Sequence, residues 1–207
     1  MRRILLTGAT GFVGKQVLKS LAKEDVSIRV ITRGTQDHFF SQYENVSEVI
    51  HTNNFFTEST IWYEEACQDV DIIIHVAWYA EPGKYLESPL NLECLAGTLN
   101  FAKSACKQGI KKFVGVGTCF EYDLTHSSPL DINAPLNPQF LYSTAKVNAF
   151  LLLSKYFKNE NIDFLWTRIF YLYGEDEDER RLVAVLRKKL ALGESVDLTS
   201  GTQIRDF

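Results

Sequence analysis

Short apolar runs alternate with longer segments of helical periodicity along most of the chain. Six runs are rich in apolar and β-branched side chains and are flanked by turn residues, which is the pattern of strands. The predicted strands are residues 3–7, 27–32, 47–51, 71–76, 112–117 and 163–168. Apolar residues recur at helical spacing between them. The predicted helices are residues 12–23, 59–67, 89–108 and 141–157, of which 59–67 has the weakest pattern.

This alternation predicts an α/β fold. Parallel neighbours in a sheet need a long crossover connection, and a helix supplies it. We therefore expect a doubly wound parallel sheet with helices on both faces. The main domain is placed at residues 1–174 and a small C-terminal part at residues 175–207.

The strand and helix pattern weakens after residue 174. An acidic run is followed by a predicted helix over residues 181–192 and a predicted strand over residues 195–199. The sequence then stops directly after an expected turn. We therefore expect a truncated C-terminal part and a fragment of a longer protein.

Composition narrows the class of ligand. The chain has 207 residues, of which 45% are hydrophobic, enough to bury one sizeable core. The net charge of −4 and the lack of a long basic run argue against nucleic acid as a partner. No apolar run approaches the roughly 18 residues of a membrane span, and the four cysteines lack metal or disulfide spacing. We expect a cytoplasmic protein with a small-molecule ligand, no membrane partner, no disulfide and no metal.

Three glycines follow the first predicted strand at the spacing G-x-x-G-x-x-G. Gly8 permits a tight turn, Gly11 removes a side chain where the backbone would meet a pyrophosphate, and Gly14 lets helix and strand approach. The helix N-terminus then offers N–H groups to phosphates. The turn predicts a Rossmann-like nicotinamide-dinucleotide site, although a purely structural strand-to-helix turn is the competing interpretation. The neighbouring residues expected at this cofactor are Thr10, Phe12 and Val13.

The second predicted strand ends in Thr32 and Arg33, with no carboxylate before Asp37. In this fold the residue at that place reads the adenosine ribose. An acid there favours NAD, whereas a basic side chain accepts the 2′-phosphate of NADP. We expect NADP as the preferred cofactor and NAD as the alternative, with Thr32 and Arg33 at the ribose. Arg33 as an ordinary solvated cation is the competing interpretation.

Tyr142 and Lys146 open a predicted helix at i, i+4 spacing, which puts the phenol and the ammonium on one face. A nearby ammonium lowers the pKa of a tyrosine toward the range of a general acid/base. Thr118 follows the fifth predicted strand, at the strand end where ligands bind in such sheets, so its hydroxyl can hold a carbonyl oxygen beside Tyr142. Together the three describe a carbonyl reductase that takes hydride from nicotinamide and a proton from Tyr142. Taken alone, Thr118 is an ordinary turn residue at a strand end, and the spacing of Tyr142 and Lys146 is a weak signal that can arise by chance.

These segments resemble the extended short-chain dehydrogenase/reductase family of the NAD-dependent epimerase/dehydratase type. The resemblance covers TGATGFVG at 7–14, DIIIHVA at 71–77, GTCFEY at 117–122, YSTAK at 142–146, RIFYLYG at 168–174 and QIRDF at 203–207. It implies a dinucleotide-binding domain at 1–174, a partial substrate-binding region at 175–207, and the catalytic trio Thr118, Tyr142 and Lys146. It also implies that Lys146, Tyr142, Ala77, Asn54 and Phe55 lie at the cofactor. The residues implied at the substrate are Thr118, Tyr142, Tyr171 and Arg205, with Arg205 facing the pyrophosphate of a nucleotide sugar.

Departures from the family pattern narrow the reaction. Dehydratases of this type carry an Asp-Glu pair after the catalytic threonine, whereas this chain has Cys119 and Phe120, which disfavours dehydration. The GTCFEY segment and residues 181–183 look most like reductases of 4-keto-6-deoxyhexose nucleotides. We therefore expect an NADP(H)-dependent reductase of a nucleotide-linked 4-keto-6-deoxy sugar. The alternatives are an NAD-dependent nucleotide-sugar C4 epimerase, a reductase of small ketones and a non-catalytic NADP-binding module.

Two predicted helices, 89–108 and 141–157, resemble the pair that forms a four-helix interface in homodimers of the family. Both carry apolar residues beyond one core-facing stripe, such as Phe150, Leu151 and Leu152. We therefore expect a homodimer. His75 lies on an apolar predicted strand and is interpreted as a core histidine, and Trp78 is expected to border the pocket.

Overall fold

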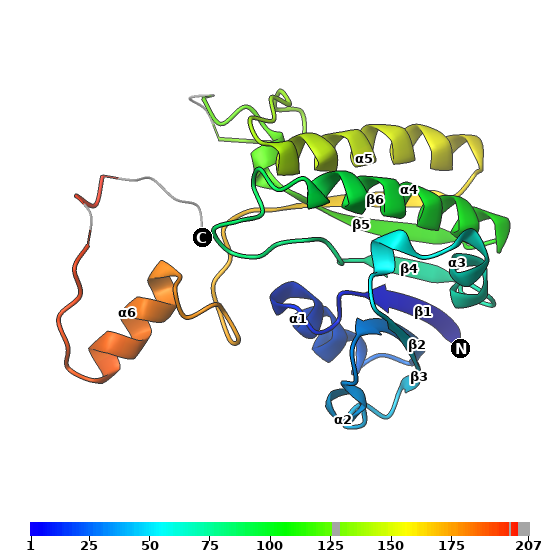
Figure 1. Cartoon of the computed structure of the whole chain (residues 1–207), viewed down its shortest axis with the longest axis horizontal. Helices are drawn as coiled ribbons and strands as arrows, with labels where there is room; N and C mark the ends of the chain where they lie inside the picture. Colours follow the sequence, from blue (N-terminus) through cyan, green and yellow to red (C-terminus); the bar gives the residue numbers. More distant parts are fainter. Residues whose placement is uncertain (126–128, 199, 203–207) are drawn as a thin grey trace. The chain divides into compact units, whose positions relative to one another are not determined.

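The computed structural model describes residues 1–125, 129–198 and 200–202 (Figure 1). The chain forms two compact units, Met1–Arg168 and Ile169–Phe207. The predicted strand end at Thr199 and the segment 203–207, which contains Arg205, lie outside the described residues. The two units are described separately below.

A six-stranded parallel sheet forms the centre of the first unit. Its strands are β1 (Arg2–Thr7), β2 (Val26–Arg33), β3 (Val46–Thr52), β4 (Ile72–His75), β5 (Lys112–Thr118) and β6 (Asp163–Ile169). All six were predicted, and their order across the sheet is β3-β2-β1-β4-β5-β6. The winding direction reverses between β1 and β4. In open sheets of this type ligands bind beyond the carboxyl ends of the strands at that reversal.

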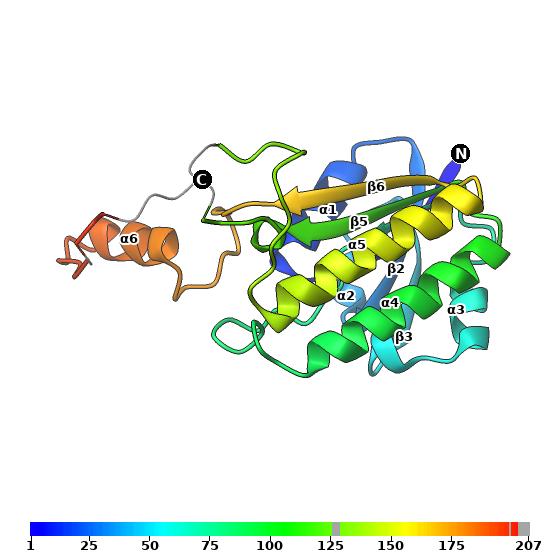
Figure 2. The same cartoon turned by 90° about the horizontal axis from the view of Figure 1, so that it is seen from above.

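Helices cover both faces of the sheet, as predicted. On one face lie α1 (Phe12–Leu21) and the single-turn α2 (Asp37–Phe40), and on the other lie α3 (Thr60–Ala66), α4 (Leu90–Lys107) and α5 (Leu141–Asn159) (Figures 1 and 2). Two 3-10 turns, η1 (Phe55–Thr57) and η2 (Cys119–Glu121), follow β3 and β5. The sequence did not predict α2, η1 or η2, because three or four residues are too few to show a hydrophobic repeat.

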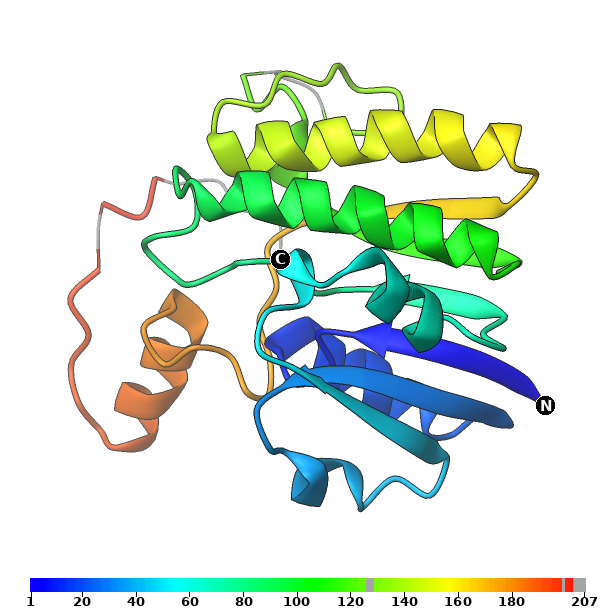
Figure 3. The same ribbon diagram turned by 45° about the vertical axis from the view of Figure 1, so that its right-hand side comes forward.

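The core has two parts, one on each face of the sheet. Side chains alternate between the faces along a strand, so Leu5 packs beneath α4 and α5 whereas Leu6 packs with Leu18 of α1. Figure 3 shows α4 and α5 side by side over the sheet. Because both faces are covered, the central strands β1 and β4 contain continuous apolar runs. The doubly wound fold predicted from the sequence is confirmed.

The second unit contains α6 (Leu182–Ala191), which confirms the helix predicted near residues 181–192. The predicted strand over 195–199 is wrong for residues 195–198, which form no strand and are mostly exposed. A strand needs a neighbour for its backbone hydrogen bonds, and this short segment has none in the sheet. In the described part of the chain, no helix has the length and apolar character needed to cross a membrane.

Candidate functional site

The glycine turn between β1 and α1 is built by the backbone. Gly8 adopts a φ of +74°, and a Cβ there would lie 2.7 Å from the Ala77 nitrogen. A Cβ at Gly14 would collide with the carbonyl group of Gly8. Gly11 differs, because the nearest atom to a Cβ there would be the Gly8 carbonyl oxygen at 3.5 Å. The fold itself therefore requires Gly8 and Gly14, while Gly11 leaves open backbone of the kind that a pyrophosphate would approach.

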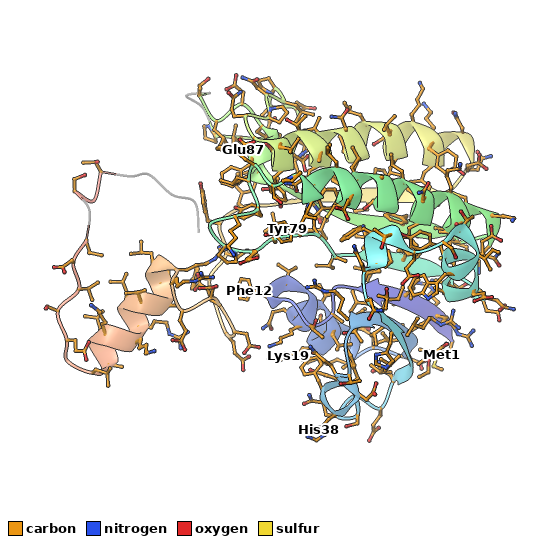
Figure 4. All side chains as sticks on the ribbon, in the orientation of Figure 1. Met1, Phe12, Lys19, His38, Tyr79 and Glu87 are labelled. Atoms are coloured by element: carbon orange, nitrogen blue, oxygen red, sulfur yellow. The ribbon has the colours of Figure 1, made fainter. Side chains whose placement is uncertain are left out.

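The N-terminus of α1 fits an anionic ligand. Its N-cap residue is Gly11, so no side chain caps the first N–H groups of the helix. The first turn also has no acidic residue. Thr10, Phe12 and Val13 lie half-buried around this helix start, and Figure 4 labels Phe12 there. The first N–H groups and the positive end of the helix dipole would hold the pyrophosphate of a dinucleotide.

A buried histidine ties the turn to β4. His75 contacts the Thr7 hydroxyl through Nδ1 at 2.9 Å and the Thr98 hydroxyl through Nε2 at 2.9 Å. Burial lowers the pKa of His75 to about 3, so the imidazole is neutral. The Thr7 hydroxyl also accepts the Ala77 N–H at 3.2 Å, which fixes Ala77 against Gly8. The interpretation of His75 as a core histidine is confirmed.

The residues predicted at the adenosine lie at the carboxyl ends of β2 and β3. Thr32 is buried and Arg33 is exposed at the end of β2. Asn54 uses its Oδ1 atom to accept the Phe56 N–H at 3.2 Å and so caps η1. Phe55 packs in the core, and its carbonyl accepts a hydrogen bond from a tyrosine hydroxyl. The side-chain oxygen of Asn54, a residue expected at the cofactor, thus already accepts a backbone hydrogen bond.

The structure brings the predicted trio together. Thr118 ends β5, and Tyr142 and Lys146 lie on the first turns of α5. The Thr118 side chain lies beside the Tyr142 phenol, close enough to lower the pKa of that phenol in part. The buried Lys146 ammonium donates to the carbonyl of Val116, two residues before Thr118, at 2.6 Å. The three side chains therefore form one buried cluster at the carboxyl end of β5.

The segment between β4 and α4 holds the start of α5. The Leu86 carbonyl accepts the Tyr142 N–H at 2.9 Å, and the Glu87 carboxylate accepts the Leu141 N–H at 3.2 Å. The Tyr85 ring meets the Tyr142 ring edge-on at 4.8 Å. Figure 4 labels Tyr79 and Glu87 on this segment. Sequence reasoning missed these contacts, because an irregular segment carries no periodic signal.

Trp78 lies over Lys146. Its ring centroid is 3.9 Å from the Lys146 Nζ atom, and its indole N–H donates to Asn91 at 2.8 Å. Burial lowers the pKa of Lys146 to about 7, while the charge of Glu121 raises it. Trp78 was expected to border the pocket. Its ring also lies near that of Tyr142, with 6.5 Å between the ring centroids.

The expected lowering of the Tyr142 pKa by Lys146 is wrong for this structure. Burial, and next the Tyr85 phenol, raise the pKa of Tyr142 above its ordinary value. The Lys146 ammonium is engaged with Val116 and Trp78, and its own charge is weakened by burial. Desolvation therefore outweighs the cation, and the phenol stays protonated at neutral pH.

A buried acid that the sequence did not single out lies behind Thr118. Glu121 is 0% exposed and accepts the Thr118 N–H at 2.9 Å. Its other oxygen accepts the Arg168 Nε–H at 2.6 Å. The residue types within GTCFEY gave no sign of this pairing, because Arg168 comes 47 positions later in the chain.

The other two residues predicted at the substrate belong to the second compact unit. Tyr171 is half-buried in the second compact unit, and Arg205 lies outside the described residues. All four cysteines are free thiols. Among the residues with described positions, no three His, Cys, Asp or Glu side chains gather closely enough to hold a metal ion.

Comparisons with known proteins agree on one family. The model of the NAD dependent epimerase/dehydratase family matches residues 4–207. The chain is 27% identical to the dTDP-6-deoxy-L-talose 4-dehydrogenase (NAD(+)) of Aggregatibacter actinomycetemcomitans, over 99% of this chain and 74% of that protein.

Two solved structures share the fold. The UDP-glucuronic acid 4-epimerase of Bacillus cereus, in complex with UDP-glucuronic acid and NAD, aligns with a TM-score of 0.80 at 21% identity, covering 99% of this chain and 68% of that one. The UDP-N-acetylglucosamine 4-epimerase of Methanobrevibacter ruminantium M1, in complex with UDP-N-acetylmuramic acid, aligns with a TM-score of 0.79 at 20% identity, covering 94% and 64%. This chain thus spans less than two thirds of the second structure.

Proposed function

The chain belongs to the NAD dependent epimerase/dehydratase family, and from this premise we propose that it is an NADP(H)-dependent reductase of a nucleotide-linked 4-keto-6-deoxy sugar. The observation that carries the proposal is the buried cluster of Thr118, Tyr142 and Lys146 at the carboxyl end of β5. The glycine turn and the start of α1 supply the matching dinucleotide site. A module that only bound the cofactor would have no use for the trio.

The protonation state of Tyr142 suits reduction. The Tyr142 phenol carries its proton at neutral pH, as a phenol of ordinary pKa also does, and can donate that proton to the oxygen formed from a ketone. Thr118 lies beside the Tyr142 phenol, and its hydroxyl would hold that same oxygen. Lys146 would hold the nicotinamide ribose. When bound, the cofactor supplies the hydride.

Two observations support a 4-keto-6-deoxy sugar as the substrate. The curated relative is named as a 4-dehydrogenase of a 6-deoxy sugar nucleotide, and the reverse of that oxidation is reduction of a 4-keto group. Elimination of water would need a proton shuttle after Thr118. Burial instead raises the pKa of the Cys119 thiol there, so the thiol stays protonated at neutral pH and cannot accept a proton, and Phe120 cannot titrate.

For the cofactor we propose NADP over NAD. The supporting observation is Arg33, exposed at the end of β2 where the adenosine ribose would lie. The names of the relatives point the other way, since the talose dehydrogenase is named with NAD(+) and the Bacillus cereus structure contains NAD. A nucleotide-sugar C4 epimerase using NAD is therefore the second candidate, favoured by the two structural relatives.

The substrate side of the proposal includes two residues outside the cluster. Arg205, in the proposed substrate-binding part at residues 175–207, would face the nucleotide pyrophosphate, and Tyr171 would lie near the sugar. The guanidinium suits a pyrophosphate because it offers paired N–H donors.

We also propose a homodimer formed by α4 and α5. Large apolar side chains are exposed on both helices, with Leu92 at 57%, Leu151 at 54% and Leu152 at 51%. Such side chains are commonly buried between subunits. Light scattering at micromolar concentration tests this proposal, and a monomeric mass would overturn it.

Calorimetric titration with NADPH, NADH and then a deoxythymidine-diphosphate 4-keto-6-deoxyhexose tests the function. The proposal requires NADPH to bind at least about tenfold tighter than NADH, a difference of about 1.4 kcal/mol. It also requires the sugar nucleotide to oxidise the bound cofactor. Tighter binding of NADH would favour the epimerase, and cofactor binding with no response to the sugar would favour a binding module.

A further inference from the structure

Among the described residues, every hydrogen bond to the Glu121 carboxylate comes from an N–H donor. Its Oε1 atom accepts from the Thr118 backbone at 2.9 Å and from the Trp166 indole at 3.1 Å. Its Oε2 atom accepts from Arg168 Nε at 2.6 Å and lies 3.2 Å from the same indole nitrogen. An ionised carboxylate is the side chain that satisfies this arrangement, because a glutamine would turn its NH₂ group toward a donor.

Arg168 balances the buried charge. It pairs with Glu121 where both side chains are shielded from solvent, with side-chain exposures of 12% and 0%. The guanidinium lies over the rings of Tyr122 and Phe150, at 4.9 and 4.6 Å from their centroids. Removing either partner of such a buried pair would leave an uncompensated buried charge and destabilise the fold.

Strand β5 has glycine at the two positions, Gly115 and Gly117, that face this arrangement. A Cβ at Gly115 would collide with the Trp166 ring, and a Cβ at Gly117 would collide with both Glu121 and the Trp166 indole. Gly117 immediately precedes Thr118, and Val116, between the two glycines, accepts the Lys146 hydrogen bond. The strand segment that packs on Glu121 and Trp166 is thus the one that positions Thr118 and Lys146.

Thr118 is held from two sides. Its N–H donates to Glu121, and its hydroxyl oxygen, which lies beside the Tyr142 phenol, accepts the Phe120 N–H at 3.3 Å. Together the first two contacts close a capping box over η2. With backbone and side chain both fixed, the hydroxyl has little freedom to leave the Tyr142 phenol.

We propose that Glu121, with Arg168 as its counter-ion, is a positioning residue that holds the Thr118 hydroxyl in place beside Tyr142. The consequence for catalysis rests on the proposed function. The consequence for Thr118 itself does not. A displacement of reacting groups by about 1 Å can lower a rate by about a hundredfold, so the effect of losing this support is measurable.

The test compares Glu121→Gln with a matched control, Glu48→Gln. Both carboxylates accept an arginine Nε–H at 2.6 Å, and Glu48 pairs with Arg29 between β2 and β3, away from the trio. Turnover with NADPH and a 4-keto-6-deoxyhexose nucleotide gives kcat and KM, calorimetry gives the cofactor Kd, and ¹⁵N NMR follows the Thr118 amide. We expect Glu121→Gln to lower kcat by about tenfold or more, with the cofactor Kd changed less than about twofold. The Thr118 amide resonance should shift upfield, and Glu48→Gln should change none of the three.

The outcomes separate this inference from the proposed function. An unchanged kcat in Glu121→Gln, or an equal fall in Glu48→Gln, would overturn a positioning role. If the wild-type chain turns over no nucleotide sugar, the proposed function fails and the Thr118 amide decides alone, with an unshifted resonance overturning the inference. If Glu121→Gln does not fold, Arg168→Lys takes its place, because lysine keeps the charge but loses the planar fork. The same shift of the Thr118 amide is then required.

Discussion

The glycine turn and the carboxyl end of β5 build their sites by different means. The turn uses backbone: a positive φ at Gly8, the absence of a Cβ at Gly14 and the first N–H groups of α1. The end of β5 uses buried side chains from distant parts of the chain, with Glu121 and Arg168 behind Thr118 and Trp78 over Lys146. A backbone site depends on local spacing, whereas a side-chain site depends on tertiary contacts. Substitutions should therefore affect the two sites differently.

The largest effect is expected at the side-chain site, from Tyr142→Phe. Removing the phenol hydroxyl removes the proposed proton donor while keeping the ring that packs on Tyr85 and Trp78. We expect kcat to fall by about 10²- to 10⁴-fold, the range for loss of a general acid. Steady-state kinetics with a 4-keto-6-deoxyhexose nucleotide measures this fall.

Tyr156→Phe is the control for Tyr142→Phe, because Tyr156 lies near the other end of the same helix. It should leave kcat within about twofold of the wild type. Comparable turnover in Tyr142→Phe and the wild type would remove Tyr142 from the chemistry.

At the backbone site the corresponding change is Gly14→Ala. The new methyl group would collide with the Gly8 carbonyl group, so the helix and the turn cannot keep their present distance. We expect a loss of about 3 kcal/mol in the free energy of unfolding, as for other overpacked cores, and loss of cofactor binding. Urea denaturation and calorimetry with NADPH and NADH measure the two effects.

Gly11→Ala separates the effect on cofactor binding from the effect on stability. Its Cβ meets no protein atom closer than 3.5 Å, so stability should change by less than about 1 kcal/mol. Cofactor affinity should still fall, because the methyl group would occupy the approach of the pyrophosphate. Equal stability losses at Gly11 and Gly14 would contradict the division of roles between them.

The two sites also differ in how much the sequence could predict. The spacing of Gly8, Gly11 and Gly14, the six strands and the pairing of Tyr142 with Lys146 follow from local pattern, and the structure places them as expected. The raised pKa of Tyr142 and the support from Glu121 depend on burial and on residues far along the chain, which one sequence does not reveal. The predicted strand at 195–199 is wrong over residues 195–198 for a related reason, because a strand depends on hydrogen bonds to a neighbouring strand as much as on its own residues.

His75, which contacts Thr7 beside the glycine turn, should make the stability of the chain depend on pH. Its pKa is about 3 in the folded chain and about 6.5 when unfolded, so between these values the unfolded chain binds more protons. Stability should therefore fall as the pH falls from about 6.5 toward about 3, by up to about 1.4 kcal/mol per pH unit from this group. Urea denaturation across that range should show a smaller slope for His75→Gln than for the wild type. The exposed His38→Gln serves as the control, and an unchanged slope in His75→Gln would contradict the assignment.

An effect confined to the affinity for one cofactor is expected at the edge of the backbone site, where the contact is made by a side chain. Arg33→Ala removes an exposed guanidinium at the end of β2 and leaves the glycine turn intact. If Arg33 accepts the 2′-phosphate, the Kd for NADPH should rise about tenfold, or about 1.4 kcal/mol, while the Kd for NADH changes less than about twofold. Lys23→Ala removes another exposed cation from the same domain and should change neither Kd. An equal effect of Arg33→Ala on both cofactors would mean that the arginine contacts no 2′-phosphate, and the preference would then have to arise from the backbone turn alone.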